Sequence, residues 1–231
     1  MTNETTKTKA LLLPYELELL EKGQGIDIGC ASDPITGTCR LFDKTHGDAN
    51  DIEKYVSEKF DYVYSSHCLE DMDDPRKSIR SWWTLVKPGG HLFLVVPDED
   101  LYEQGFFPSR FNPSHKWTFT INKYKSWSPN SINLLPLLQN LPNAEVLRIE
   151  LQDNNYNRIL GFGGVASIMN NKFIRRPIRF YKRLRRLGIR FPSLEELAGY
   201  NNAPIDQTLQ QDVLAQIFSI TRKRTDAHKD V

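Results

Sequence analysis

Two apolar runs joined by an amphipathic segment constrain the fold of this chain most strongly. Residues 60–66, FDYVYSS, alternate aromatic and β-branched residues, and residues 91–97, HLFLVVP, form a nearly continuous apolar run. Residues 75–87 between them carry apolar side chains at helical spacing: Ile79, Trp82, Trp83 and Val86. Pro88-Gly89-Gly90 ends this helix. The order strand, helix, strand predicts two parallel strands joined by a crossover helix.

The rest of the chain continues this alternation. Pro14 and Gly23 bracket a short helix, and residues 25–30, GIDIGC, predict a buried strand that Gly29 ends. Further strands are expected at 39–44, 145–151 and 215–223, and further helices at 52–59 and from Ser128 and Pro129 to about Leu141. The sequence therefore predicts the fold class α/β, with a mostly parallel sheet and helices on both faces.

Length and composition favour one domain over 1–231, with residues 157–210 as an insertion or cap before the last strand. The formal net charge of +1 provides no overall attraction to nucleic acid. Three Cys form no even framework, which favours reduced thiols. The N-terminal apolar run is too short for a signal peptide, and no apolar stretch is long enough to span a bilayer, so a cytoplasmic location is expected.

The candidate functional residues follow the ends of the predicted strands, where ligands bind in open α/β sheets. Cys30 follows Gly29 at the end of the first strand, and the small residues Gly29, Ala31 and Ser32 allow the backbone there to approach a ligand closely. Asp43 ends the second strand and can accept hydrogen bonds from ribose hydroxyls. Asp48 beside Ala49 can recognise adenine. Each Asp alone is as well explained as a turn residue, but together they indicate a nucleoside site.

Residues 60–104, FDYVYSSHCLEDMDDPRKSIRSWWTLVKPGGHLFLVVPDEDLYEQ, resemble the class I S-adenosylmethionine-dependent methyltransferases. The resemblance continues through SRFNPSHKWTFT and covers residues from about 23 to 151. It implies a Rossmann-like sheet and S-adenosyl-L-methionine as the cofactor. A nicotinamide dehydrogenase is disfavoured because the chain has no GxGxxG.

The resemblance also implies roles for particular residues. Those expected to hold the methionine part of the cofactor are Asp27, Gly29, Cys30 and Ala31, with Asp43 at the ribose and Asp48 and Ala49 at the adenine. Ser65, Ser66 and His67 would lie beside the sulfonium. The chain departs from the family pattern at Ala31, where a second Gly is common, and at Asp71, where LEH reads LED. Ala31 fits the loop if its φ is negative. The first helix and third strand of the pattern are abbreviated.

Methyl transfer requires a base only if the acceptor is a hydroxyl or a protonated amine. His115 is the first candidate, followed by His67 and the acidic run Asp98-Glu99-Asp100. Each His is equally well explained as a hydrogen-bonded structural residue, and the acidic run as a solvated loop or helix cap. No spacing of candidate ligands points to a metal.

The expected reaction is O-methylation of a sugar or small-molecule hydroxyl. The alternative is an inactive methyltransferase-like protein that binds cofactor or acts as a scaffold, which Ala31 and Asp71 favour. Residues 175–188, RRPIRFYKRLRRLG, form a basic amphipathic helix that suits an anionic membrane or a lipid-linked substrate. An ordinary solvated helix face explains this segment equally well. No nucleic-acid partner is expected.

Overall fold

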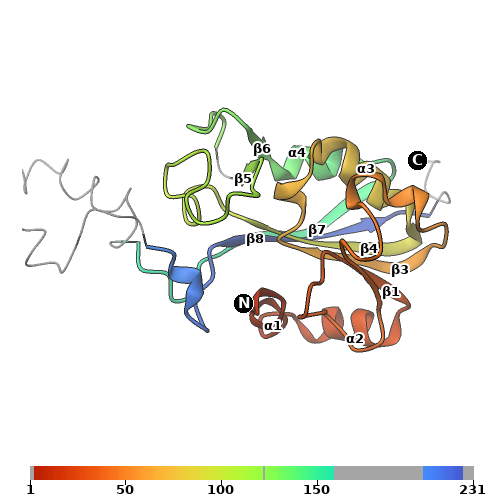
Figure 1. The fold of residues 1–231 in the computed structure, drawn as a ribbon. Helices are drawn as coiled ribbons and strands as arrows, with labels where there is room; N and C mark the ends of the chain where they lie inside the picture. The colour runs from red at the N-terminus through yellow and green to blue at the C-terminus, as the bar shows by residue number, and fades with distance from the viewer. Residues whose placement is uncertain (1–2, 122, 159–204, 226–231) are drawn as a thin grey trace, which may run out of the picture.

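The computed structural model describes residues 3–121, 123–158 and 205–225. A six-stranded sheet in the order β2-β1-β3-β4-β8-β7 lies at the centre (Figure 1). Its strands are β1 (Gly25–Ile28), β2 (Arg40–Phe42), β3 (Phe60–Ser66), β4 (Val86–Pro97), β7 (Ala144–Gln152) and β8 (Gln216–Lys223). The first four in the sheet are parallel, whereas β8 runs antiparallel to both β4 and β7. The predicted α/β class with a mostly parallel sheet is confirmed.

Helices cover both faces of the sheet. On one face lie α1 (Glu4–Lys9) and α2 (Pro14–Lys22), and on the other lie α3 (Pro75–Thr84) and α4 (Leu134–Gln139) (Figure 1). Because side chains alternate along a strand, Tyr62 and Tyr64 of β3 enter the core with Leu20 of α2, whereas Val63 enters the core with Trp82 of α3. Two apolar cores therefore hold the sheet between the helix layers.

Helix α3 follows its sequence signals closely. The side chain of Asp74 caps its start by accepting hydrogen bonds from the N–H groups of Arg76 and Lys77. The helix ends at Thr84, and β4 already begins at Val86. Residues 88–90 therefore lie inside β4, where the register with β3 shifts as an irregularity.

Two predicted helices are wrong in extent or type. Instead of a helix over 52–59, the chain forms the 3₁₀ helix η1 (Ala49–Lys54), which overlaps only the start of that segment. No helix begins at Ser128, because Ser131–Asn133 forms strand β6, which pairs in parallel with β5 (Thr118–Thr120). Helix α4 starts only at Leu134, where the Asn133 side chain caps the N–H of Leu135. Tertiary pairing thus overrides the Ser-Pro start signal.

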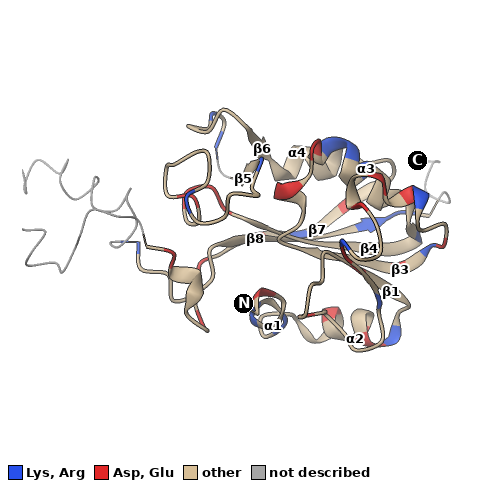
Figure 2. Cartoon of the chain, viewed as in Figure 1, with Lys and Arg blue, Asp and Glu red and all other residues tan. Residues whose placement is uncertain are grey.

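Two short 3₁₀ helices, η2 (Leu69–Asp71) and η3 (Gln207–Leu209), complete the described elements. The predicted basic helix 175–188 and most of the proposed insertion 157–210 lie outside the described residues. Within the described ranges, no helix combines the length and apolar character that crossing a membrane requires. Acidic and basic residues are interspersed over the helices and loops on both faces (Figure 2).

Candidate active site

A cleft of about 510 Å³ lies at the carboxyl ends of β1, β2 and β3. Five of the residues predicted from the sequence line it: Gly29, Asp43, Asp48, Ala49 and His67. Seven lining residues were not predicted: Phe42, Lys44, Gly47, Tyr55, Cys68, Asp71 and Met72. Five predicted cofactor residues do not line it: Asp27, Cys30, Ala31, Ser65 and Ser66. The position matches the general rule that ligands bind beyond the carboxyl ends of parallel strands.

Gly29 occupies a place that admits no side chain. Its φ is +80°, and an added Cβ would lie 2.7 Å from Cβ of Cys68. Its N–H donates to the carbonyl of Phe42 at 2.7 Å, which ties the end of β1 to the end of β2. Ala31 also has a positive φ, +44°, so the condition under which Ala31 would fit the loop without strain is not met. The loop after β1 therefore carries strain at a residue that is not glycine.

Asp27 and Ser65 do not line the cleft, but their side chains hold the loop and the strand ends beside it. Asp27 is 1% exposed, and its carboxylate accepts a hydrogen bond from the N–H of Ile35 at 2.8 Å. Burial raises the pKa of Asp27 to about 7. The Ser65 hydroxyl donates to the carbonyl of Ile28 at 2.9 Å and so joins β3 to β1. Cys30 and Ser66 are likewise buried.

Asp43 and Asp48 are turn residues that also line the cleft. Asp43 accepts a hydrogen bond from the N–H of Lys44 at 2.7 Å. Asp48 caps η1 by accepting from the N–H of Asn50 at 2.9 Å, and this bond lowers its pKa. The interpretation of both as turn residues is therefore confirmed, and a carboxylate in such a turn keeps further lone pairs that a ligand could use.

His67 lies at the β3 end of the cleft with both nitrogens close to polar side chains. Its Nε2 is 3.0 Å from Oε1 of Gln216, and its Nδ1 is 3.6 Å from Oε1 of Glu70. Burial lowers the pKa of His67, but the nearby Glu70 carboxylate outweighs it and raises the pKa to about 9.

His115 does not line the cleft, and the Glu70 carboxylate lies near both His115 and His67. It is 5% exposed, its Nδ1 is 2.7 Å from Oε1 of Glu103, and its Nε2 is 3.7 Å from Oε1 of Glu70. Burial lowers the pKa of His115, but the Glu103 hydrogen bond and the Glu70 charge produce a net increase. Glu70 therefore stands between the two predicted catalytic histidines, His67 and His115.

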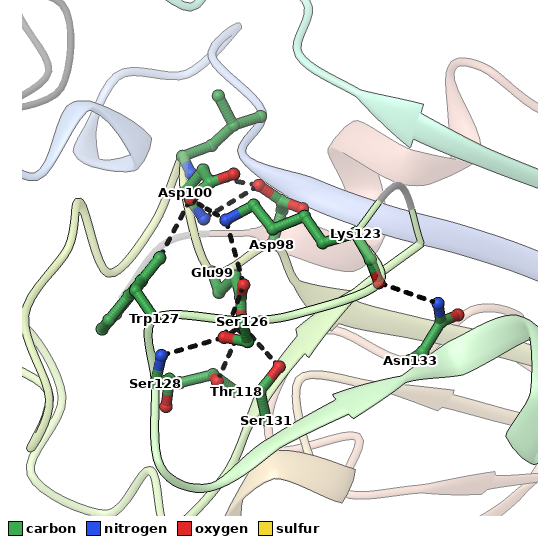
Figure 3. A network of polar contacts seen from close by, with 11 residues as sticks. Asp98, Glu99, Asp100, Thr118, Lys123, Ser126, Trp127, Ser128, Ser131 and Asn133 are labelled. Atoms are coloured by element: carbon green, nitrogen blue, oxygen red, sulfur yellow. Dashed lines mark hydrogen bonds and ion pairs between the residues drawn. The ribbon is translucent and has the colours of Figure 1, made fainter.

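The acidic run after β4 forms a separate network (Figure 3). Glu99 is fully buried and accepts hydrogen bonds from four side chains: Thr118, Lys123, Ser126 and Ser131. Asp100 accepts from Lys123 and Trp127, and Asp98 caps a turn by accepting from the N–H of Leu101. Burial raises the pKa of Asp98 to about 6. None of the three lines the cleft; they hold the 118–133 segment against the end of β4.

The unpredicted lining residues had weak sequence signals. Phe42 and Lys44 flank Asp43, and Asp71 stood out only as a departure from LEH. Tyr55 gave no signal, because it reaches the cleft through packing against Gly47. Among the residues that the structure describes, no group of three or more His, Cys, Asp or Glu is placed to hold a metal ion.

Comparisons with known proteins identify the family of this chain. The family model for the methyltransferase domain matches residues 5–159. No curated protein sequence matches the chain. A putative methyltransferase, solved in complex with the Haloferax volcanii Trm112 methyltransferase activator, is 12% identical, with 97% of this chain and 90% of that chain covered and a TM-score of 0.50.

Two further solved structures are more distant in shape. The plantazolicin methyltransferase BamL, solved with a substrate analogue and SAH, is 13% identical, covers 96% of this chain and 85% of its own, and has a TM-score of 0.45. A putative sarcosine dimethylglycine methyltransferase from Galdieria sulphuraria is 13% identical, with coverages of 94% and 84% and a TM-score of 0.46. The match of the family model over residues 5–159 establishes that the chain belongs to the S-adenosyl-L-methionine-dependent methyltransferase family.

Proposed function

We propose that this enzyme methylates a hydroxyl group of a sugar or another small molecule, with its cofactor in the cleft at the ends of β1, β2 and β3. The observation that carries this proposal is the meeting of Gly29, Asp43 and Asp48 in one cleft of about 510 Å³. This volume lies within the range of roughly 300–1,000 Å³ for small-molecule sites. Small residues along the wall and two carboxylates fit an adenosyl group.

Each part of the cleft has a proposed task. Asp43 accepts hydrogen bonds from the ribose, and Asp48 with Ala49 binds the adenine. Gly29 allows the methionine part to approach the backbone, and Asp27 holds the loop through Ile35. Four further predicted residues do not line the cleft, and we propose that they contact the cofactor through their backbone or hold the residues that do: Cys30, Ala31, Ser65 and Ser66. When bound, S-adenosyl-L-methionine supplies an electrophilic methyl group on a sulfonium.

Calorimetric titration of the full chain with S-adenosylmethionine and S-adenosylhomocysteine tests the cofactor site. Loss of a charged hydrogen-bond acceptor costs about 1.5–3 kcal/mol of binding free energy. Asp43→Asn is therefore expected to lower the affinity for both ligands by roughly tenfold to a hundredfold. The matched control is Asp73→Asn, an exposed carboxylate off the cleft paired with Lys116. Failure of the wild-type chain to bind either ligand would contradict the proposal.

The acceptor class is tested by incubation with methyl-labelled cofactor and fractionated cell extract. Label that is stable to base and co-migrates with a sugar or small alcohol supports O-methylation. Label that appears only on amines, or only on macromolecules, contradicts the proposed acceptor.

The inactive scaffold is favoured by one observation, the positive φ of Ala31 in the cofactor loop. A non-glycine residue in this region costs roughly 1–2 kcal/mol. Ala31→Gly is therefore expected to stabilise the chain by about 1 kcal/mol in urea denaturation. If it also converts a chain that does not bind S-adenosylmethionine into one that does, the scaffold reading is correct.

The segment 175–188, outside the described residues, is proposed to contact an anionic membrane or a lipid-linked acceptor. Its basic and apolar faces support this proposal. Flotation with anionic vesicles should succeed at low salt and fail at high salt, because the attraction between exposed charges is screened. Absence of flotation at low salt would rule this contact out.

A further inference from the structure

The proposed transfer to a hydroxyl requires a group at the cleft that takes the hydroxyl proton. At the β3 end the cleft is lined by His67, Cys68, Asp71 and Met72. Burial raises the pKa of Cys68 further above its ordinary value, so its thiol stays protonated. The choice of base therefore lies between His67 and Asp71, with His115 behind them.

A chain of side-chain amides determines the protonation of His67 Nε2. Gln152 Nε2 lies 2.9 Å from Oε1 of Glu150, and a carboxylate can only accept, so Gln152 must present its Oε1 to Gln216. Gln216 Nε2 then donates to Gln152 Oε1 at 2.8 Å and to the Thr8 hydroxyl at 2.7 Å. This leaves Gln216 Oε1 facing His67, so the Nε2 of His67 carries a hydrogen.

The other nitrogen of His67 faces Glu70. The Glu70 side chain is fully buried, and neither of its carboxylate oxygens has a hydrogen-bond partner among the described residues. A bare Nδ1 opposite a bare carboxylate would leave two acceptors facing each other in a buried place. A proton therefore belongs between Nδ1 of His67 and Glu70. Neither nitrogen of His67 is left to take a proton from a substrate.

His115 is committed in the same way. Its two nitrogens face Glu103 and Glu70, it does not line the cleft, and its ring lies 5.1 Å from the ring of Tyr102. A substrate proton could reach it only through Glu70. The geometry therefore makes His115 a partner of the buried carboxylates.

Asp71 has the properties that the histidines lack. It lines the cleft, and its Oδ2 lies 3.1 Å from the Ser114 hydroxyl, which also lies 2.6 Å from Oδ1 of Asn112. Its Oδ1 is buried and has no hydrogen-bond partner among the described residues. Burial, and then the charge of Glu70, raise the pKa of Asp71. The other charged groups that face it are His115 and Lys44. A partly desolvated carboxylate is a better proton acceptor than a solvated one.

We propose that Asp71 is the catalytic base of the methyl transfer, an inference that rests on the proposed function of the cleft. The hydroxyl O–H bond of the acceptor breaks and its proton moves to the Asp71 carboxylate. The acceptor oxygen forms a bond to the methyl carbon while the bond from that carbon to sulfur breaks, and a neutral thioether leaves. Asp71 then returns the proton to water, so the enzyme ends unchanged.

A binding experiment tests this without an identified acceptor. A base that reaches the acceptor oxygen must also lie close to the sulfonium, so its charge favours the cation over the neutral thioether. Asp71→Asn is expected to lower the affinity for S-adenosylmethionine by roughly tenfold more than that for S-adenosylhomocysteine. Asp73→Asn, the exposed neighbour with the same chemical change, should alter neither affinity. Equal losses for both ligands in Asp71→Asn would contradict the proposal.

Methyl incorporation from labelled cofactor into fractionated cell extract gives the second readout. Asp71→Asn is expected to reduce the rate by about 10²–10⁴-fold, and Asp71→Glu to retain more of it. The wild-type rate should rise with pH as Asp71 ionises, and Asp71→Asn should lose this limb of the profile. A rate within threefold of wild type, roughly, would overturn the proposal.

The binding experiment and the methyl-incorporation experiment together distinguish failure of Asp71 as the base from failure of the proposed methyltransferase function. A wild-type chain that binds neither ligand removes the proposed function itself. A wild-type chain that binds both ligands but has no acceptor in the extract leaves the ratio of affinities to decide the role of Asp71. Normal turnover in Asp71→Asn would leave the proposed methyltransferase function intact and would contradict only the role of Asp71 as the base.

Discussion

Two fully buried glutamates, Glu99 and Glu70, differ in the groups that surround their carboxylates. Glu99, after β4, accepts hydrogen bonds from three hydroxyls and one ammonium group (Figure 3). Glu70, in η2, has two imidazoles at 3.6 and 3.7 Å and no side-chain hydrogen bond among the described residues. Both carboxylates are 0% exposed. Only the second lies beside a residue that lines the cleft.

This difference separates a structural network from a functional one. The donors around Glu99 keep their hydrogens across the ordinary pH range, so the network holds one arrangement. The partners of Glu70 titrate, so its surroundings change charge with pH. A buried carboxylate paired with titratable groups is a weak stabiliser and a useful neighbour for proton transfer.

The largest expected effect comes from breaking the Glu99 network. Glu99→Ala removes the carboxylate acceptor of three hydroxyls and one of the two carboxylates paired with the Lys123 ammonium group. This should lower the free energy of unfolding by about 3–5 kcal/mol. Urea denaturation measures this, with Glu58→Ala, an exposed pair with Arg40, as the control of about 0–1 kcal/mol. Cofactor affinity should remain unchanged. A loss as small as that of the control would show that Glu99 does not hold the segment.

Glu70→Gln should have an effect that depends on pH. The folded-state pKa of His67 is about 9, above its ordinary value near 6.5, so its contribution to stability is complete below about pH 6.5 and disappears as pH rises through 9. In wild type the free energy of unfolding should therefore fall by roughly 1–3 kcal/mol over this window. Glu70→Gln should remove most of this slope.

Urea denaturation at several pH values within that window measures the slope. Glu99→Ala serves as the comparison, because its loss should keep nearly the same size throughout. An unchanged slope in Glu70→Gln would mean that Glu70 does not hold the proton of His67.

The smallest effect concerns one donor of the Glu99 network. Ser131 donates to Oε2 of Glu99 at 2.6 Å, and Ser131→Ala leaves three donors in place, so a loss of about 1 kcal/mol is expected. Ser128 is a matched control because its buried hydroxyl has no hydrogen-bond partner in the described structure. Ser128→Ala should be neutral or slightly stabilising in the same denaturation experiment. Equal losses in both variants would show that the bond to Glu99 contributes nothing.

Much of the fold was predictable from local patterns. The strands β1, β3, β4 and β8 and the helices α2 and α3 all follow apolar periodicity or Pro and Gly boundaries. The helix expected from Ser128 failed because Ser131–Asn133 pairs with β5, a contact between segments that no local signal encodes. The positive φ of Ala31 was likewise not encoded by any local pattern in the sequence.

The candidate site also has parts that local sequence patterns predict and parts that only long-range contacts determine. The sequence by itself determined that Gly29 and Asp43 follow strand ends and that Asp48 lies in the turn after Asp43, because periodicity marks the strands and parallel strands bring their carboxyl ends to one edge of a sheet. Only the tertiary structure decided that His67 lines the cleft with polar side chains near both nitrogens and that Glu70 separates His115 from His67. It also decided that one buried oxygen of Asp71 has no hydrogen-bond partner within the described part of the chain. Hydrogen bonds between residues as distant as His67 and Gln216 depend on the packed sheet, and no spacing along the chain encodes them.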